Sequence, residues 1–399
     1  MAEGPFLRSK LPARAGASSL DQRDRLLLLA ACLGWERPAD DGALRLRIEA
    51  AGAAWPDLVA LANSDLLAPT LWSRLRAKGL EGSLPDAAAA YLRRSHSVNI
   101  VRNERIKTQL VAAIRAMNAR GVEPVILKGA VDLFVSRYDD PGARILRDVD
   151  LFIPRDAIPD ARAALLDAGY RELPPEPGKF VTYFVEFTRT GAIVPYDVQW
   201  FISGQRDLLG PDEAWRDSIL RRDGDLRVRT LSAEHQIVHN LLHSELQDRG
   251  ADLGFVWLRQ LLDLAALVRQ LGVAVAWPEV QARFVRAGVG SVVAKRLYLA
   301  HRLLGLPMPD GIAPTLAGTL HHRRALAQLR WPWLTCSLRL WATMTSPIDP
   351  RLLDLVYSGE DARPPRGLLR VRHVARLMHR YGANLPAVIR KRHMKFDRA

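Results

Sequence analysis

The sequence contains only two cysteines among its 399 residues, Cys32 and Cys336. Two cysteines this far apart cannot build a disulfide framework, so a reducing cytoplasm is the expected compartment. Long apolar runs are also lacking. The run at residues 26–33 is too short to span a bilayer, and no small-residue cleavage site follows it. These absences predict a cytoplasmic protein with neither a signal peptide nor a transmembrane segment.

Acidic residues are scarce at one end of the chain. Residues 362–399 contain eleven Lys and Arg against the single acid Asp397, whereas the rest of the chain carries 46 basic and 42 acidic residues. The net charge of +14 is therefore mainly a feature of this basic tail. Such a tail suits an anionic partner, namely nucleic acid, an anionic membrane surface or an acidic protein. A merely solvated tail is the simplest alternative, and the aromatic interleaving typical of single-strand binders is absent.

The rest of the composition is that of an ordinary globular protein, with 48% hydrophobic and 25% charged residues. Helical periodicity dominates residues 21–121, and the longest pattern covers residues 85–120 and stops at Gly121. We therefore expect a loose tail at residues 1–20 followed by an N-terminal helical region at residues 21–121.

A short apolar run ends in Lys128-Gly129, and a second apolar run further along begins with Asp148-Val149-Asp150. Since side chains alternate along a strand, Asp148 and Asp150 are expected on one face. Two adjacent carboxylates repel each other unless a cation lies between them, and Mg²⁺ is the hard cation that oxygen ligands beside phosphates favour. A polar strand end is the alternative, but Asp is disfavoured in strands. The pattern predicts a metal site at Asp148 and Asp150.

A third carboxylate follows on a predicted hairpin formed by residues 180–188 and 193–202. Asp197 and Gln199 would share one face of its second strand. Because Pro195 indicates an edge strand, Asp197 could instead be a solvated edge residue. Its position one hairpin after the paired acids makes it our third candidate ligand.

Leu127-Lys128-Gly129 and the run at residues 144–151, RILRDVDL, resemble motifs of the nucleotidyltransferase superfamily, in particular of a poorly characterised bacterial branch. The resemblance implies an α+β fold in which helical regions flank a small mixed sheet. Two positions depart from the family pattern. Gly129-Ala130 stands where the family commonly has Gly-Ser, and Gln199 replaces a His in Asp197-Val198-Gln199-Trp200.

The activity implied by the resemblance is transfer of a nucleoside monophosphate from a triphosphate such as ATP to an unidentified hydroxyl acceptor, with release of pyrophosphate. The acceptor could be a small molecule, a peptide or a protein. Asp148, Asp150 and Asp197 would hold two Mg²⁺ ions, with Mn²⁺ as the alternative ion, and would be the catalytic residues. The candidate nucleotide-binding residues are Lys128, Gly129, Ala130, Arg144, Arg147 and Gln199, with Arg144 ranked above Arg147.

Two other functions remain open. The departures at Ala130 and Gln199 would also suit a catalytically silent scaffold, and the basic tail would suit a nucleic-acid-associated protein. His235, His239 and His243 fall on one helical face, which invites a metal interpretation. Because apolar residues surround them and no zinc-protease Glu follows His235, we favour a structural or nucleotide-adjacent role.

These observations predict five segments: the tail at 1–20, the helical region at 21–121, an α/β core at 122–205, a C-terminal helical region at 206–361 and a basic tail at 362–399.

Overall fold

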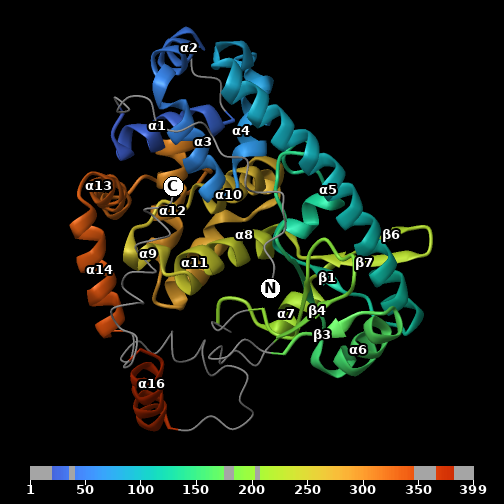
Figure 1. Cartoon of the computed structure of the whole chain (residues 1–399). Helices are drawn as coiled ribbons and strands as arrows, with labels where there is room; N and C mark the ends of the chain where they lie inside the picture. The colour runs from blue at the N-terminus through green and yellow to red at the C-terminus, as the bar shows by residue number, and fades with distance from the viewer. Residues whose placement is uncertain (1–19, 36–40, 175–183, 203–206, 346–364, 382–399) are drawn as a thin grey trace.

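The computed structural model describes residues 20–35, 41–174, 184–202, 207–345 and 365–381 (Figure 1). The chain opens with five helices, which are α1 (Gln22–Leu33), α2 (Asp41–Ala50), α3 (Trp55–Ser64), α4 (Ala68–Lys78) and α5 (Asp86–Ala119). Helix α5 agrees closely with the helix predicted at residues 85–120. It begins after Pro85 and ends before Gly121, whose φ of +79° favours glycine.

A seven-stranded mixed sheet follows. Its strands are β1 (Val125–Ile126), β2 (Val149–Phe152), β3 (Arg171–Glu172), β4 (Phe184–Thr188), β5 (Tyr196–Gln199), β6 (Ile219–Asp223) and β7 (Leu226–Thr230), in the order β3-β4-β5-β2-β1-β7-β6. Strands β2 and β5 are parallel, as are β1 and β7, and all other neighbours are antiparallel. The α+β class predicted from the sequence is confirmed.

Helices on the sheet and after it complete the fold. They are α6 (Ile158–Asp167), α7 (Pro211–Arg216), α8 (Ala233–Leu241), a π-helix (Leu242–Gln247), α9 (Gly250–Leu253), α10 (Leu258–Leu271), α11 (Trp277–Arg286), α12 (Ser291–Leu304), α13 (Leu316–Arg330), α14 (Pro332–Thr345) and α16 (Arg366–Tyr381).

Several local predictions differ from the structure. The helical pattern after Lys128 forms only a 3₁₀-helix at Lys128–Leu133. The first strand of the predicted hairpin is described only at Phe184–Thr188, because residues 175–183 lie outside the described part of the chain. The hairpin β6–β7 was not predicted, since residues 206–361 were expected to be helical. Strand β7, LRVRT, alternates apolar and polar residues over only five positions, and β6, ILRRD, does not alternate, so the signal for strands is weak.

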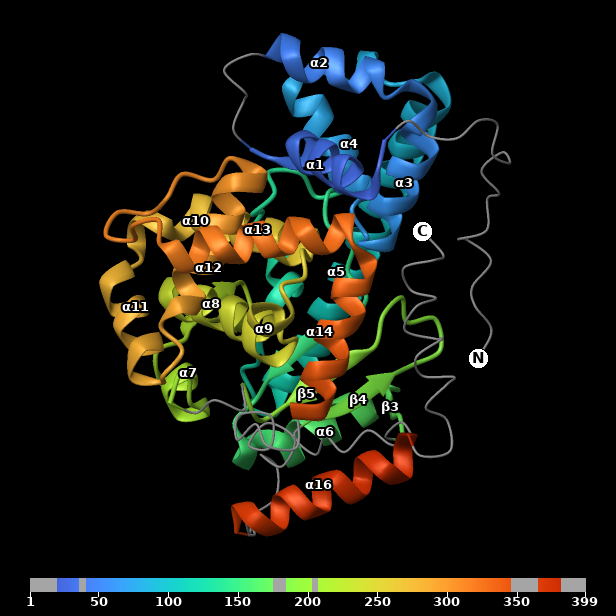
Figure 2. The same ribbon diagram turned by 90° about the vertical axis from the view of Figure 1, so that its left-hand side faces the viewer.

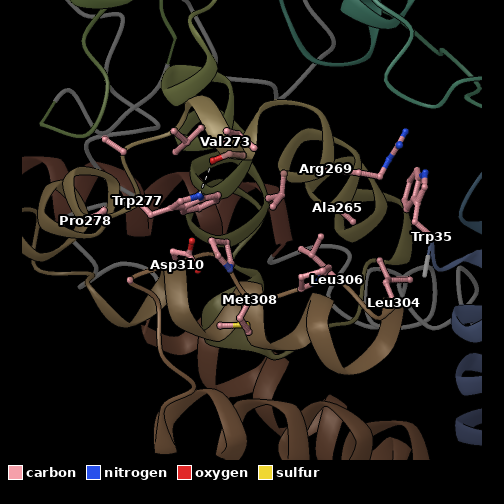
Figure 3. Close-up of a pocket in the computed structure, with 17 residues that line it drawn as sticks. Trp35, Ala265, Arg269, Val273, Trp277, Pro278, Leu304, Leu306, Met308 and Asp310 are labelled. Carbon is pink, nitrogen blue, oxygen red and sulfur yellow. Dashed lines mark hydrogen bonds between the residues drawn. The ribbon is translucent and has the colours of Figure 1, made fainter. Parts of the chain in front are cut away.

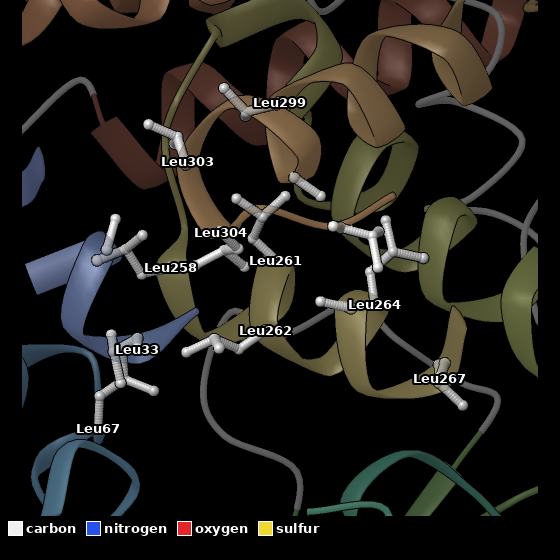
Figure 4. Close-up of a cluster of buried hydrophobic side chains, with 14 of the residues drawn as sticks. Leu33, Leu67, Leu258, Leu261, Leu262, Leu264, Leu267, Leu299, Leu303 and Leu304 are labelled. Atoms are coloured by element: carbon white, nitrogen blue, oxygen red, sulfur yellow. The ribbon is translucent and has the colours of Figure 1, made fainter. Parts of the chain in front are cut away.

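The sheet separates two hydrophobic cores. Ile126, Val149, Leu151 and Ile153 pack into one core with residues of α5 and α6. Val125, Leu127 and Phe152 point the other way, into a larger core built by helices from both ends of the chain. Figure 4 shows this larger core, where leucines of α10 and α12 meet two leucines from the N-terminal helices. The N-terminal and C-terminal helices thus share one core over one face of the sheet.

Among the described helices, none is by itself long and apolar enough to cross a membrane, although the bent pair Leu258–Ala274 and Trp277–Arg286 meets the same length and composition criteria.

Candidate functional site

The predicted carboxylates meet on two neighbouring strands. Asp150 on β2 and Asp197 on β5 are direct partners in the parallel register, and Asp148 precedes Asp150 by two residues. Side chains at the same register position of adjacent strands leave the sheet on the same face. Because Val149 and Leu151 fill the core shared with α5 and α6, the three carboxylates belong to the opposite face, toward the C-terminal helices.

Lys128 reaches these carboxylates from the end of β1. Its Nζ donates to Oδ1 of Asp150 at 2.7 Å, and its backbone has a φ of +49°, in the left-handed region that lysine seldom adopts. Burial disfavours the charge on Lys128, but attraction to Asp150, Asp148 and Asp197 outweighs it and raises the pKa of the ammonium group. The site therefore contains a fixed positive charge directly beside the carboxylate cluster.

The carboxylates retain strong mutual repulsion despite this lysine. Burial, reinforced by the charges on Asp150 and Asp148, raises the pKa of Asp197 to about 7. Burial also raises the pKa of Asp150, although Lys128 opposes the shift. One ammonium group thus does not neutralise the cluster. A divalent cation bound by the carboxylate oxygens would do so, because hard cations of this kind prefer oxygen ligands.

The residues after Lys128 form a tight turn against Arg144. A Cβ added to Gly129 would lie only 1.6 Å from Nη1 of Arg144, so a larger residue here would have to displace the guanidinium group. Ala130 is buried, and its methyl group lies in the core on the other face of the sheet. Of these two residues, only the backbone can contribute to a binding site.

The Arg144 guanidinium group is held by two carboxylates. Its Nε and Nη2 donate to Asp263 of α10 at 2.8 Å each, and Asp132 lies 3.3 Å from Nε. The Tyr138 hydroxyl donates to the same Asp263 at 2.6 Å. Asp132 also pairs with Arg137, whose Nη2 donates to the carbonyl oxygen of Lys128 at 2.8 Å. In this structure Arg144 supports the turn under Lys128-Gly129.

The other two predicted nucleotide-binding residues lie in different settings. Arg147 is exposed next to Asp148. Gln199 is buried near the end of β5, where its backbone carbonyl accepts a hydrogen bond from the amide of Ile153 at 2.9 Å. The structure therefore brings Lys128, Asp150 and Asp197 together, while Arg144 is engaged by carboxylates of its own.

Sequence reasoning missed the residues that hold the segment between β1 and β2. His96, Asn99 and Asn103 lie on one buried face of α5. Asn99 and Asn103 donate to the carbonyls of Gly142, Arg144 and Pro141, and His96 contacts the Asp140 carboxylate at 2.8 Å. Polar residues spaced by three and four on the buried face of a long helix were the available signal.

The three histidines of the sequence pattern fall into two groups. Burial, together with the nearby charge of Lys128, lowers the pKa of His243 to about 3. The same two causes lower the pKa of His239 well below its usual value. His235 instead groups with Glu213 and Asp217, whose ligand atoms lie within 4.8 Å of one another. Both carboxylates of this second group already bind arginines, Glu213 pairing with Arg283 at 2.8 Å and Asp217 with Arg216 at 2.9 Å.

A separate cavity of about 740 Å³ lies on another side of α10 (Figure 3). Its walls are mainly apolar and include Trp35, Trp277 and Met308, with Arg269 and Asp310 as charged members. The Trp277 indole is fixed by a 3.2 Å hydrogen bond to the Gly272 carbonyl. None of the predicted site residues lines this cavity, so the carboxylate cluster remains the candidate active site.

Comparison with known proteins agrees with the family predicted from the sequence motifs. A family model described as an uncharacterised nucleotidyltransferase matches residues 51–305, which include every predicted site residue. The same chain matched none of the curated proteins and none of the solved structures with which it was compared.

Proposed function

The chain belongs to this uncharacterised nucleotidyltransferase family, and we propose that it transfers a nucleoside monophosphate from a triphosphate to a hydroxyl acceptor in a reaction that depends on a divalent metal. The observation that carries the proposal is the register of β2 and β5, which sets Asp150 beside Asp197 with Lys128 bonded to Asp150. Three carboxylates and one lysine on the same face of a sheet form a site for a metal and a triphosphate.

The donor set fits Mg²⁺ or Mn²⁺. Asp148, Asp150 and Asp197 supply only oxygen ligands, and a bound cation would favour the charged form of Asp197, whose pKa is raised by burial and by the charges of Asp150 and Asp148. When bound, such ions supply charge neutralisation for a transferring phosphoryl group and acidify an acceptor hydroxyl. The cluster of Glu213, Asp217 and His235 is a weaker candidate, because arginines occupy its carboxylates.

Other residues of the site bind the triphosphate, accept the proton of the acceptor or position Lys128. Lys128 provides a positive charge for the triphosphate, and the amides that follow Gly129 provide hydrogen-bond donors. The acceptor oxygen forms a bond to the α-phosphorus while the bond from that phosphorus to the bridging oxygen breaks, and pyrophosphate leaves. The acceptor proton passes to the Asp197 carboxylate. Arg144, Arg137 and Asp263 position Lys128 without contact to the substrate.

The test is thermal stability of the protein with ATP, GTP, CTP or UTP, each with Mg²⁺ and with EDTA. We expect one triphosphate to stabilise the wild type only with Mg²⁺, by about 2–3 kcal/mol at a concentration near one hundred times its Kd. Asp148→Ala/Asp150→Ala should abolish this shift, whereas Asp156→Ala/Asp160→Ala, which changes two exposed acids after β2, should keep it. Mg²⁺-dependent stabilisation that persists in the first variant would refute the site.

A silent scaffold is the second candidate, favoured by Ala130, whose buried methyl group stands where the family commonly has a serine. The two functions differ in their products. With the stabilising triphosphate, a transferase releases pyrophosphate once a suitable hydroxyl compound is present, and release stops in Asp148→Ala/Asp150→Ala. A scaffold binds the same triphosphate but releases none with any acceptor.

A further inference from the structure

Helix α16 combines strong positive charge with an apolar face. Its sequence, RGLLRVRHVARLMHRY, contains five arginines and no acidic residue. Leu368, Val371 and Val374 recur every third residue along one side. With about 3.6 residues per turn, Arg370 and Arg372 fall on the two edges of these aliphatic positions of the helix. The helix is therefore amphipathic, with an aliphatic stripe between two arginines.

The aliphatic side of α16 faces outward. Leu368 is 57% exposed, Val371 66% and Val374 39%, whereas Leu369 on a different side is only 2% exposed. Arg370 and Arg372 are also exposed. An apolar stripe that stays in water while another side of the helix is buried marks a surface for a partner.

Helix α14 also carries exposed tryptophans. Trp333 and Trp341 of α14 are 65% and 59% exposed, and Trp331 just before the helix is 48% exposed. Figures 1 and 2 both place α16 and the C-terminal end of α14 at the end of the molecule opposite α2, and Trp341 is nearer to this end of α14 than Trp331 and Trp333. Tryptophan side chains are favoured where an apolar phase meets water, because one edge of the ring is polar and the rest is not.

We propose that α16, together with Trp341 near the C-terminal end of α14, docks the protein on the surface of an anionic lipid bilayer. Arg370 and Arg372 would face the phosphate headgroups while Leu368 and Val371 enter the acyl boundary, the arrangement typical of interfacial amphipathic helices. This surface is separate from the carboxylate cluster, so the inference stands or falls independently of nucleotidyl transfer.

Charge alone would not select a bilayer, because nucleic acid and acidic proteins also attract arginine. The exposed aliphatic stripe makes the distinction, since a phosphodiester backbone offers nothing to bury Leu368, Val371 and Val374. A bilayer accommodates the aliphatic stripe and the two arginines at its edges at once. Lipid binding should therefore depend on the stripe and on the arginines, whereas nucleic-acid binding should depend on the arginines alone.

The experiment is sedimentation of the full chain with phosphatidylcholine vesicles that contain 30% phosphatidylglycerol or none, at low and high salt. Leu368→Glu/Val371→Glu tests the stripe and Arg370→Glu/Arg372→Glu tests the charge. Two controls lie elsewhere on the surface: Leu46→Glu on α2, where the leucine is 67% exposed, and Arg93→Glu/Arg94→Glu on α5, where both arginines are exposed. Circular dichroism confirms that each variant is folded.

We expect the wild type and both controls to bind the anionic vesicles, with little binding to pure phosphatidylcholine. Each α16 variant should lower the partition coefficient at least about tenfold, because two favourable contacts become repulsive. A wild type that binds neither vesicle overturns the proposal. So does equal binding by the wild type and Leu368→Glu/Val371→Glu. Binding to a single-stranded oligonucleotide that survives in Leu368→Glu/Val371→Glu, with no lipid binding, assigns the arginines to nucleic acid instead.

Discussion

Gly129 shows how a single missing side chain shapes the site. Its Cα lies so close to Arg144 that a methyl group would sit 1.6 Å from the guanidinium Nη1. Gly129→Ala therefore has to displace Arg144 from its carboxylate partners, and we expect it to lower the free energy of unfolding by about 1–3 kcal/mol. Urea denaturation measures this effect.

Gly52→Ala is the matched control for that substitution. An added Cβ at Gly52 meets nothing within 4 Å, and Gly52 lies in a 3₁₀-helix with no positive φ. This variant should be at least as stable as the wild type. If Gly129→Ala proves equally stable, the close packing of Arg144 on the turn is incorrect.

The raised pKa of Asp197 predicts how the stability of the metal-free protein depends on pH. Its folded-state pKa of about 7 lies above the value of about 4 expected in the unfolded chain. The folded, metal-free protein therefore holds a proton that the unfolded chain releases, so this carboxyl stabilises the fold at low pH and loses that contribution as the pH rises through about 7. In EDTA, Asp197→Asn should remove part of the decline in stability between pH 5 and pH 8.

Added Mg²⁺ reverses this dependence, because the ion competes with the proton for Asp197. The affinity for Mg²⁺, followed by thermal stability, should increase from pH 6 to pH 8 in the wild type. Other raised carboxyls, such as Asp132 with a pKa of about 6, titrate in both proteins, so the comparison with Asp197→Asn isolates one residue. Identical pH profiles for the two proteins would contradict the assignment.

The residues that carry charge were predictable from the sequence, and their supporting partners were not. Asp148, Asp150 and Lys128 stand at the ends of short apolar runs, where a charge is locally conspicuous. Asp263 lies among leucines of α10, far along the chain, and its bond to Arg144 appears only when α10 packs beside the turn. Sequence spacing reports neighbours within one element, and long-range pairs of this kind need the fold.

At the scale of elements, the pair of Arg144 and Asp263 ties the turn after β1 to α10. Burial disfavours the Asp263 charge, but Arg144, Arg259 and the Tyr138 hydroxyl outweigh it and hold its pKa well below the usual range. Asp263→Asn leaves a buried guanidinium group with less compensation. We expect the free energy of unfolding to fall by about 3–5 kcal/mol.

A double-mutant cycle with Arg144→Gln and Asp263→Asn tests whether the loss belongs to the pair. The double variant should be much less destabilised than the sum of the single variants, since neither charge is then left alone. Asp225→Asn, which breaks the exposed pair with Arg115, is the control and should change stability little. Additive losses from Arg144→Gln and Asp263→Asn would exclude direct coupling.

The order of elements was also only partly predictable. Helix α5 is long, periodic and bounded by Pro85 and Gly121, so its limits could be read from the sequence. Strands β6 and β7 are short and rich in arginine, and β7 joins the sheet by parallel pairing with β1. That pairing depends on a partner far away in the sequence, which local periodicity cannot report.

At the scale of the whole molecule, the larger core draws on both ends of the chain. Leu33 of α1 and Leu297 of α12 are both fully buried in it, and Val125 and Phe152 of the sheet extend into it. A Cβ on Gly34 would lie 2.5 Å from the Leu304 carbonyl oxygen, which shows how closely α1 approaches the end of α12. Because this larger core joins both helical regions to the sheet, we expect one cooperative unfolding transition.

Leu33→Ala and Leu297→Ala test this cooperativity. Each removes a fully buried leucine, one from the N-terminal and one from the C-terminal helices, and each should destabilise the same transition by about 2–5 kcal/mol. Unfolding followed by far-UV circular dichroism and by tryptophan fluorescence should coincide in every variant. Leu46→Ala, at a position 67% exposed, should leave the midpoint nearly unchanged. Two separated transitions, of which Leu33→Ala moves only one, would show instead that the N-terminal helices fold as an independent domain.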